Sequence, residues 1–311
     1  MVIGVAVSSA AAADDQDIAI DVPAGALHGS LLLPELGQPG PAVLLIAGSG
    51  PTDRDGNSST GSVRPDNLRQ IARGLAERGI ASLRYDKRGL AGSRAAMTDE
   101  SGLRFNMLVD DAAAWARRLA EQPGVTCVIL AGHSEGALIA AMAAQRSNSC
   151  GVVEMAGAGR PAKVVLAEQL TRGLPPADLG RALRTLDTVA AGGLVADPPM
   201  PSLFRPAIQP FLASYLSIDP AAELVKARVP ALIIQGERDI QVSVQDARAL
   251  ARARPDAPLL LLPTANHVLK QAPVDRAGNI ATYADPALPI DAAILPAMLE
   301  FIDKTKPHKS H

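Results

Sequence analysis

Residues 127–136 read Cys127-Val128-Ile129-Leu130-Ala131-Gly132-His133-Ser134-Glu135-Gly136. The apolar first half predicts a buried strand, and the apolar residues that follow predict a helix over 134–146. Between them stands the pattern G-x-S-x-G, which in a strand–turn–helix context is typical of a nucleophile elbow. Its glycines are needed because strand and helix pack closely around a strained residue. The pattern predicts that the hydroxyl of Ser134 is an exposed nucleophile at a helix N-terminus.

Apolar runs alternate with helical stretches on both sides of this motif. Six runs are apolar almost throughout, as in strands buried on both faces: 42–46, 80–85, 127–131, 151–155, 231–235 and 259–262. The pattern predicts further helices over 65–78, 104–121, 243–253 and 291–303. Before them, alternating residues around Pro23-Ala24-Gly25 predict an antiparallel hairpin over 17–33. We expect an α/β fold in which a mostly parallel twisted sheet has antiparallel first strands and helices on both faces.

The stretch 158–225 interrupts this alternation. It contains helical segments and the proline-rich Asp197-Pro198-Pro199-Met200-Pro201, but no run that resembles a buried strand. We therefore expect a helical cap inserted between two strands of the sheet. The expected organisation is a signal-peptide remnant over 1–13, a core over 14–157 and 226–303, the cap over 158–225, and a polar tail over 304–311.

A serine nucleophile needs a general base, and the chain has five histidines. Three of them lie in the hairpin or in the tail: His28, His308 and His311. His133 directly precedes Ser134 and is expected to point away from it. His267 follows the last predicted strand and is expected to take the proton of Ser134 and return it to the leaving group.

The acid that orients this base is expected after the preceding strand. Residues 231–235 are followed by Gly236-Glu237-Arg238-Asp239. We assign Asp239 to accept the ring N–H of His267, fix its tautomer and stabilise the imidazolium. Glu237 is the weaker candidate, and Asp246 is expected on a solvated helix face.

Acyl transfer also needs two donors for the oxyanion of the transition state. The loop Ala47-Gly48-Ser49-Gly50 follows the first buried strand and can turn a backbone N–H toward Ser134. We assign the backbone N–H groups of Ser49 and Glu135 to this oxyanion hole. Asp53-Arg54-Asp55 is interpreted as an ion-paired brace for the loop, with substrate binding as the alternative.

Five motifs together resemble bacterial serine hydrolases of the α/β-hydrolase superfamily, in the branch related to acyl esterases and serine aminopeptidases: residues 48–57, 84–89, 132–136, 235–239 and 266–267. The chain order of serine, acid and histidine is also that of α/β hydrolases. The resemblance covers residues 17 to 303. It implies an α/β-hydrolase fold, a triad of Ser134, His267 and Asp239, and hydrolysis of short-acyl carboxylic esters through an acyl-enzyme on Ser134.

This chain departs from the superfamily pattern in two loops. Ala47-Gly48-Ser49 stands where many relatives have His-Gly, and Arg88-Gly89-Leu90-Ala91-Gly92-Ser93 has one residue more than the frequent R-G-x-G-x-S. Both departures change the shape of loops near the predicted site. They leave the mechanism intact but bear on the choice of substrate.

Other activities remain open on the same scaffold. An aminopeptidase or amidase would need an acidic pocket, for which Glu135 or Glu168 is a candidate. A lipase would need an apolar groove in the cap, and the aromatic residues Phe204, Phe211 and Tyr215 are the candidate substrate contacts, with packing onto the core as the alternative. A dehalogenase is disfavoured because its nucleophile is an aspartate. A non-catalytic binding protein is the remaining alternative, disfavoured because all three triad residues are present.

Composition limits the partners. The chain has 30 Lys and Arg against 32 Asp and Glu, a net charge of −2, and no clustered basic stripe, which argues against nucleic-acid binding. No apolar run reaches the roughly 18 residues of a membrane span, so we expect no integral membrane association. The expected partner is a small-molecule ester, and the chemistry needs no cofactor and no metal. Nothing in the sequence indicates the oligomeric state.

Two cysteines bear on the compartment. Cys127 and Cys150 open neighbouring apolar runs, so adjacent parallel strands would bring both sulfurs to the same edge of the sheet. A disulfide and two buried free thiols are the alternatives. The Ala-rich residues 1–13 resemble the end of a secretory signal with an Ala-x-Ala site. We therefore expect a periplasmic or secreted protein, with the cytoplasm as the alternative.

Overall fold

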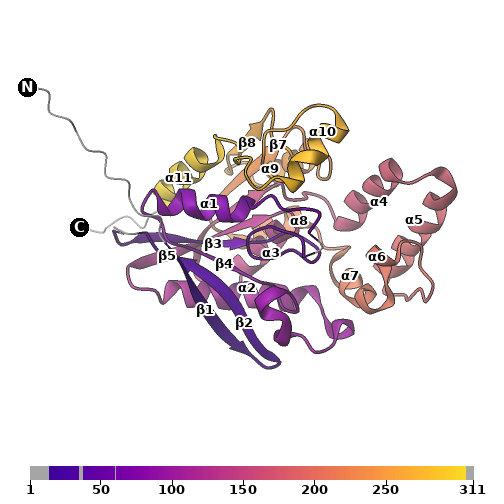
Figure 1. Cartoon of the computed structure of the whole chain (residues 1–311), viewed down its shortest axis with the longest axis horizontal. Coiled ribbons are helices and arrows are strands. Elements are labelled where there is room, and N and C mark those ends of the chain that lie inside the picture. Colours follow the sequence, from indigo (N-terminus) through magenta and orange to yellow (C-terminus); the bar gives the residue numbers. More distant parts are fainter. Residues whose placement is uncertain (1–13, 35–37, 60, 306–311) are drawn as a thin grey trace, which may run out of the picture.

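The computed structural model describes residues 14–34, 38–59 and 61–305. Its described part contains one sheet, with these strands: β1 (Asp15–Val22), β2 (Gly25–Leu32), β3 (Gly40–Ile46), β4 (Ser82–Tyr85), β5 (Val125–His133), β6 (Ser149–Met155), β7 (Ala231–Gly236) and β8 (Leu259–Leu262). Their order across the sheet is β1-β2-β4-β3-β5-β6-β7-β8 (Figure 1). β2 pairs antiparallel with β1 and β4, and the other pairs are parallel. The predicted mostly parallel sheet with antiparallel first strands is confirmed.

Burial distinguishes the central strands, which were predicted from continuous apolar runs, from the edge strand β1, which was predicted from alternation. The central strand β3 is buried over six of its seven residues, whereas the edge strand β1 alternates between exposed and half-buried residues beyond Asp17. β5 extends beyond the predicted run at both ends, because Val125 and His133 also pair with neighbouring strands. This extension carries the chain directly to Ser134.

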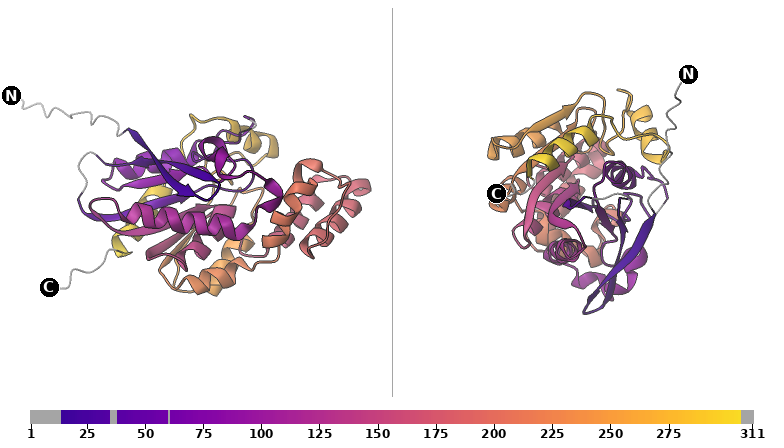
Figure 2. Two further views of the ribbon diagram at one scale, coloured as in Figure 1. Left: turned by 90° about the horizontal axis from the view of Figure 1, so that it is seen from below. Right: turned by 90° about the vertical axis from the view of Figure 1, so that its left-hand side faces the viewer.

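Helices cover both faces of the sheet (Figure 2). Around the sheet, the described helices outside the segment between β6 and β7 are α1 (Asn67–Ala76), η1 (Ala91–Ala96), η2 (Glu100–Gly102), α2 (Phe105–Ala120), α3 (Glu135–Ala144), α9 (Val244–Ala253), α10 (Arg276–Ala281), η4 (Thr282–Ala284) and α11 (Ile294–Thr305). α1 and α11 share one apolar core with the sheet, and α2, α3 and α9 share the core of the opposite face. The predicted helices at these places are present, shorter or shifted by one to three residues.

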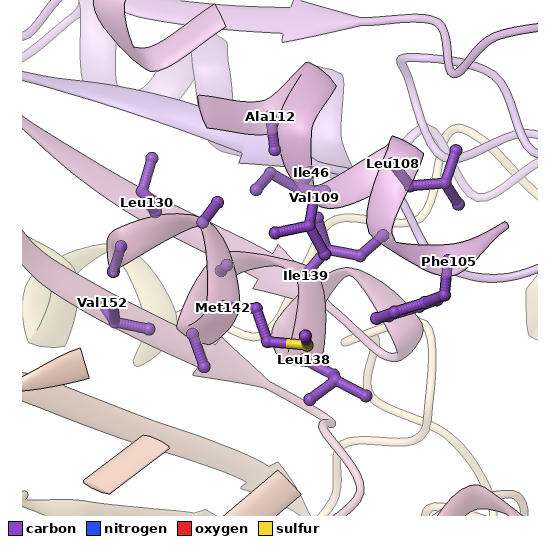
Figure 3. Close-up of a cluster of buried hydrophobic side chains, with 14 of the residues drawn as sticks. Ile46, Phe105, Leu108, Val109, Ala112, Leu130, Leu138, Ile139, Met142 and Val152 are labelled. Atoms are coloured by element: carbon purple, nitrogen blue, oxygen red, sulfur yellow. The ribbon is translucent and has the colours of Figure 1, made fainter. Parts of the chain in front are cut away.

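The core under α2 and α3 holds the elbow motif in place. Ile46 and Leu130 from the strands lie with Val109 from α2 and Ile139 from α3, all buried (Figure 3). Burying a side chain of this size contributes about 1.5–3 kcal/mol. α3 is buried along almost its whole length, as expected of a helix that is apolar on every side. A rigid α3 fixes where its N-terminus, and with it Ser134, stands.

Between β6 and β7 the chain forms a helical segment: α4 (Ala162–Gly173), α5 (Pro176–Ala190), α6 (Pro201–Phe204), η3 (Pro206–Ile208), α7 (Gln209–Tyr215) and α8 (Pro220–Ala227). α4–α7 lie together beyond one end of the sheet (Figures 1 and 2). α8 instead packs against α3 and α9. α6 and α8 were not predicted, although Asp219 caps α8 and Pro220 begins it, a recognisable start signal. Among the described helices none is long and apolar enough to cross a bilayer.

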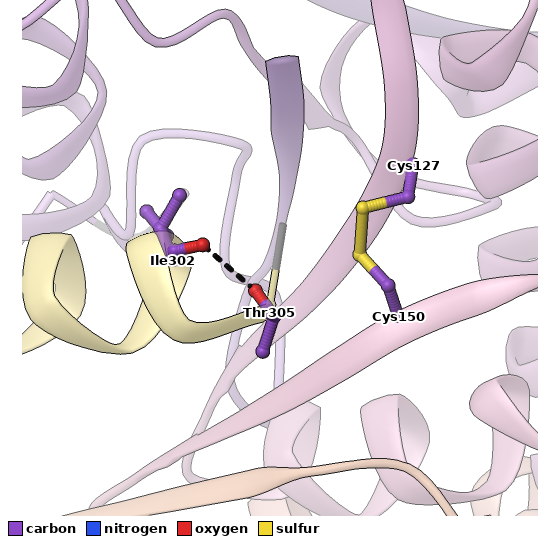
Figure 4. Close-up of a disulfide and its surroundings, with 4 residues drawn as sticks. All are labelled: Cys127, Cys150, Ile302 and Thr305. Carbon is purple, nitrogen blue, oxygen red and sulfur yellow. Dashed lines mark hydrogen bonds between the residues drawn. A yellow bond between two sulfur atoms is a disulfide. The ribbon is translucent and has the colours of Figure 1, made fainter. Parts of the chain in front are cut away.

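Cys127 of β5 and Cys150 of β6 form a disulfide, with their Cα atoms 5.9 Å apart (Figure 4). The bond joins the two strands that flank α3, so it closes the segment that carries Ser134. The structure thus has the disulfide rather than two free thiols.

The expected signal-peptide remnant over 1–13 lies outside the described residues. Of the expected tail, Lys304 and Thr305 end α11, and 306–311 lie outside the described residues.

Candidate active site

Ser134 occupies the turn between β5 and α3 with φ 56° and ψ −120°, a conformation that non-glycine residues rarely adopt. The turn leaves no room for side chains beside it. A Cβ on Gly132 would lie 2.0 Å from the carbonyl oxygen of Gly136, and a Cβ on Gly136 would lie 2.3 Å from that of Ile46. The backbone N–H of Ser134 donates to the carbonyl of Met155 at 2.9 Å. The elbow predicted from the glycine spacing is therefore present, and the half-buried Ser134 lines a cavity.

His267 and Asp239 meet where β7 and β8, parallel neighbours, reach their carboxyl ends. Nδ1 of His267 lies 2.8 Å from Oδ2 of Asp239. Oδ1 of Asp239 accepts hydrogen bonds from the backbone N–H groups of Gln241 at 2.7 Å and Val242 at 2.9 Å. Nε2 of Gln235 donates to Oδ2 at 3.1 Å. These donors hold the carboxylate toward the imidazole. Glu237, the weaker sequence candidate, is exposed.

Buried polar side chains fix the loop that carries His267. Nδ2 of Asn266 donates to Oγ1 of Thr282 at 2.7 Å, and Oδ1 of Asn266 accepts from the backbone N–H groups of Val268 and Lys270, both at 3.2 Å. In the sequence, Asn266 is recognisable only as part of the motif at residues 266–267. Its position directly before His267 was the available signal.

His133, which was expected to point away from Ser134, contacts the loop that carries His267. Its Nε2 lies 2.7 Å from the carbonyl oxygen of His267, and the two imidazole rings are 5.0 Å apart between centroids. Burial, and next the nearby His267 ring, lower the pKa of His133 to about 4. A neutral His133 donates to that carbonyl through its Nε2–H. This bond ties the residue before Ser134 to the residue predicted as its base.

The two residues predicted to supply the oxyanion donors, Ser49 and Glu135, line one cavity with Ser134. The N–H of Glu135 belongs to the first turn of α3, where backbone donors have no acceptor within the helix. Gly48 lies against Ser134, because a Cβ built on it would be 3.2 Å from Cβ of Ser134. Ser49 follows Gly48 and lines the same cavity as Ser134 and Glu135.

Lys87, for which no role was predicted, contacts both Gly48 and Glu135. Nζ of Lys87 donates to the carbonyl oxygen of Gly48 and lies 3.3 Å from Oε1 of Glu135. The side chains of Lys87 and Glu135 are 5% and 6% exposed. Lys87 comes two residues after β4 ends, at the edge of the sheet where Ser134 stands, and that placement was the signal that could have identified it.

Charged residues around the site form structural pairs. Arg54 binds Asp86 through Nη2 at 2.6 Å and Nε at 3.1 Å, and Asp55 accepts from Nε of Arg84 at 2.8 Å. These contacts agree with the interpretation of 53–55 as a brace. Asp246 was expected on a solvated face but is buried at the start of α9. Burial opposes its ionisation, yet hydrogen bonds from Arg160 at 2.8 Å and from Ser243 lower its pKa.

The cavity lies between the elbow and helices α4, α6 and α7, with a volume of about 470 Å³. Its wall is mostly apolar, and Phe211 and Tyr215 belong to it. Phe204, also predicted to touch substrate, is instead fully buried and lies outside the cavity wall, because its side chain packs into the core. Among the described residues, no group of three or more His, Cys, Asp or Glu could hold a metal ion.

The chain is similar to known proteins in sequence and in fold. The family model described as "Serine aminopeptidase, S33" matches residues 66–271. Esterase EstD of Thermotoga maritima is 30% identical over 268 residues, which cover 82% of this chain and 62% of EstD, so the chain spans less than two thirds of that relative.

Two solved structures resemble the chain over most of its length. The α/β hydrolase GrgF from Penicillium sp. sh18 has a TM-score of 0.61 and 18% identity, covering 94% of this chain and 99% of GrgF. Est1E from Butyrivibrio proteoclasticus has a TM-score of 0.59 and 17% identity, covering 92% of this chain and 99% of Est1E. At these identities the two structures show a shared fold.

Proposed function

The chain belongs to the serine aminopeptidase S33 family of α/β hydrolases, and we propose that it hydrolyses carboxylic esters through an acyl-enzyme on Ser134. The observation that carries the proposal is the strained Ser134 elbow beside the buried His267–Asp239 pair, whose Nδ1 and Oδ2 atoms are 2.8 Å apart. The name and 30% identity of EstD support an ester as the substrate.

The proposed reaction has two halves. Oγ of Ser134 attacks the ester carbonyl carbon while Nε2 of His267 takes the hydroxyl proton, and Asp239 stabilises the imidazolium. The N–H groups of Ser49 and Glu135 bind the oxyanion of the tetrahedral intermediate. The C–O bond breaks, and the alcohol leaves with the proton from His267. Water then attacks the acyl carbonyl carbon and gives a proton to His267. The bond from that carbon to Oγ breaks, His267 returns the proton to Oγ of Ser134, and the carboxylic acid leaves.

We further propose that α4–α7 cap the site and that the cavity beneath them binds short aliphatic acyl groups. A volume of about 470 Å³ lies within the range of small-molecule sites. The wall supplied by Leu138, Val165, Ile208 and Leu212 is apolar, which suits an alkyl chain. Lys87 and Glu135 bring charge near Ser134, where the ester group itself would stand.

An aminopeptidase needs an unpaired carboxylate to bind the α-amine of a peptide. Glu135 is paired with Lys87 at 3.3 Å, and Glu168 is paired with Arg160 at 2.5 Å. Both carboxylates that the sequence offered for this role therefore have a cationic partner. This pairing supports ester over peptide cleavage.

One plate assay tests the proposed function. The purified protein is offered p-nitrophenyl acetate, butyrate and decanoate beside aminoacyl p-nitroanilides. We expect turnover of the acetate and butyrate esters that is lost in Ser134→Ala and in His267→Ala. Turnover of an anilide without turnover of any ester would contradict ester hydrolysis, and faster turnover of the decanoate would contradict the short-acyl preference.

We also propose a periplasmic or secreted location. Disulfides persist in oxidising compartments and are rare in the cytosol, and the Cys127–Cys150 bond supports such a compartment. Non-reducing mass analysis of the protein from fractionated native cells tests this. A bonded form in the periplasmic or extracellular fraction is expected, and a reduced cytosolic form would contradict the proposal.

A further inference from the structure

A buried lysine side chain lines the cavity. Lys87 lies in the turn after β4, its side chain is 5% exposed, and it lines the cavity together with Ser49, Ser134 and Glu135. An ammonium group loses hydration when it is buried, so it requires compensating partners. Lys87 has two: the carboxylate of Glu135 at 3.3 Å and the carbonyl oxygen of Gly48.

Each partner is covalently linked to one of the assigned oxyanion donors. The carbonyl of Gly48 and the N–H of Ser49 are the two ends of one peptide group. The described residues contain no cis peptide bond, so the two ends point in opposite directions. Lys87 holds the carbonyl end from one side and leaves the N–H facing the other way. The second partner, Glu135, supplies the other donor from its own backbone.

Gly48 makes this peptide both close to the nucleophile and easily turned. A Cβ at Gly48 would lie 3.2 Å from Cβ of Ser134 and 3.3 Å from Nδ1 of His133, so the peptide group borders Ser134 directly. Glycines at 48 and 50 leave the loop conformationally free in the absence of other contacts. The bond from Lys87 to the Gly48 carbonyl removes that freedom.

We propose that Lys87 is a positioning residue that orients and polarises the Gly48–Ser49 peptide for oxyanion binding. A hydrogen bond to the carbonyl withdraws electron density and makes the N–H of the same peptide a stronger donor. The carboxylate of Glu135 compensates the ammonium charge and holds it in place. This inference rests on the proposed function, because it assigns Lys87 to stabilising the tetrahedral intermediate on Ser134.

Three variants separate this role from a merely structural one. Lys87→Met removes the donor, Lys87→Arg keeps a charged donor, and Lys226→Met is the matched control, because Lys226 pairs with Glu223 at 2.7 Å on α8 and does not line the cavity. With p-nitrophenyl butyrate we expect kcat to fall about 100-fold in Lys87→Met at a KM within about 3-fold of wild type, the pattern of an interaction made only in the transition state. Lys87→Arg should recover at least part of the loss, and Lys226→Met should retain wild-type kcat.

A second readout does not depend on ester turnover. A fluorophosphonate reacts when Oγ of Ser134 attacks phosphorus, the proton passes to His267 and fluoride leaves, while the phosphoryl oxygen takes the place of the oxyanion. The rate constant for this labelling, per mole of folded protein, should also fall by about 100-fold in Lys87→Met. Should Lys87→Met not fold, Lys87→Gln, which replaces the ammonium by a neutral donor, is measured in its place and should be labelled more slowly than wild type.

The kinetic and labelling results can refute the role of Lys87 and the proposed ester hydrolysis separately. A Lys87 variant that is labelled at the wild-type rate, or whose KM rises at unchanged kcat, would overturn the role of Lys87. Labelling that depends on Lys87 in a protein that turns over no ester would contradict the proposed function and leave the role of Lys87 standing.

Discussion

Nδ1 of His267 lies 2.8 Å from Oδ2 of Asp239, and the two side chains are 5% and 0% exposed. An acceptor in this position fixes the tautomer that leaves Nε2 free to take a proton. In Asp239→Asn the amide can donate instead, which favours the wrong tautomer. We expect kcat for ester hydrolysis to fall by about 10⁴-fold, the loss known for the equivalent change in a serine protease.

Steady-state kinetics of the purified variant measures this loss. Asp256→Asn is the control, because Asp256 also accepts a charged hydrogen bond, from Arg254, but its side chain is 62% exposed and remote from the cavity wall. An Asp239→Asn enzyme with kcat close to wild type would remove Asp239 from the mechanism.

The close packing around the elbow glycines leads to a prediction about the free energy of unfolding. A Cβ at Gly136 would stand 2.3 Å from the backbone carbonyl oxygen of Ile46, which cannot move without shifting β3. We expect Gly136→Ala to lower the free energy of unfolding by about 3 kcal/mol, as overpacking of a core does. Gly173→Ala is the matched control, since nothing lies within 4 Å of its Cβ position. Urea unfolding measures both, and equal stabilities would contradict the close approach.

The sequence predicts the sheet and the elbow well because both depend on local patterns. A strand buried on both faces must be apolar throughout, and the turn at Ser134 must have glycine on either side, so residues 127–136 reveal both features. The candidate triad could be proposed for the same reason: each of Ser134, Asp239 and His267 comes shortly after a strand, and the parallel strands of a sheet end at one edge.

Other contacts join loops that are distant in the chain. Asp246 reads as a solvated helix residue, but Arg160, 86 residues away, pairs with it and buries it. Lys87 reads as an ordinary charge in a loop until Gly48 and Glu135 stand beside it. Phe204 and Phe211 look alike in the sequence, as aromatic residues of the same helical stretch. Only the packing of α6 and α7 determines that Phe211 lines the cavity and Phe204 does not. Local periodicity carries no information on such partners.

Glu154 makes stability depend on pH. This residue of β6 is fully buried, and burial raises its pKa from 4.5 to about 8. The folded protein therefore holds a proton on Glu154 that the unfolded chain releases above about pH 4.5. Because the folded state binds more protons in this window, the free energy of unfolding falls as the pH rises from about 4.5 to about 8.

Glu154→Gln mimics the protonated carboxyl and cannot ionise. Relative to this variant, wild type should lose on the order of a few kcal/mol of stability between pH 5 and pH 8.5. Urea unfolding at both pH values measures the difference. Parallel pH dependence in the two proteins would show that Glu154 does not titrate in this window.

The volume of the cavity beneath α4–α7 leads to a prediction about the length of the acyl group. Ile208 is half-buried and lines the cavity. Ile208→Trp would fill part of the 470 Å³, so we expect turnover of p-nitrophenyl butyrate to fall more than turnover of the acetate. Leu194→Trp is the control in the same helical segment, because Leu194 is 71% exposed and is not part of the cavity wall. An unchanged ratio of butyrate to acetate turnover in Ile208→Trp would place the acyl group elsewhere.

The rate of p-nitrophenyl butyrate hydrolysis by Ser134→Ala, compared with wild type, tests the central claim most directly. Removing the nucleophile of a serine hydrolase leaves only the contribution of binding and of the oxyanion donors. We predict that kcat falls by at least about 10⁴-fold while the thermal unfolding midpoint stays close to that of wild type. A folded Ser134→Ala protein that hydrolyses the ester at the wild-type rate would contradict the assignment of Ser134 as the nucleophile.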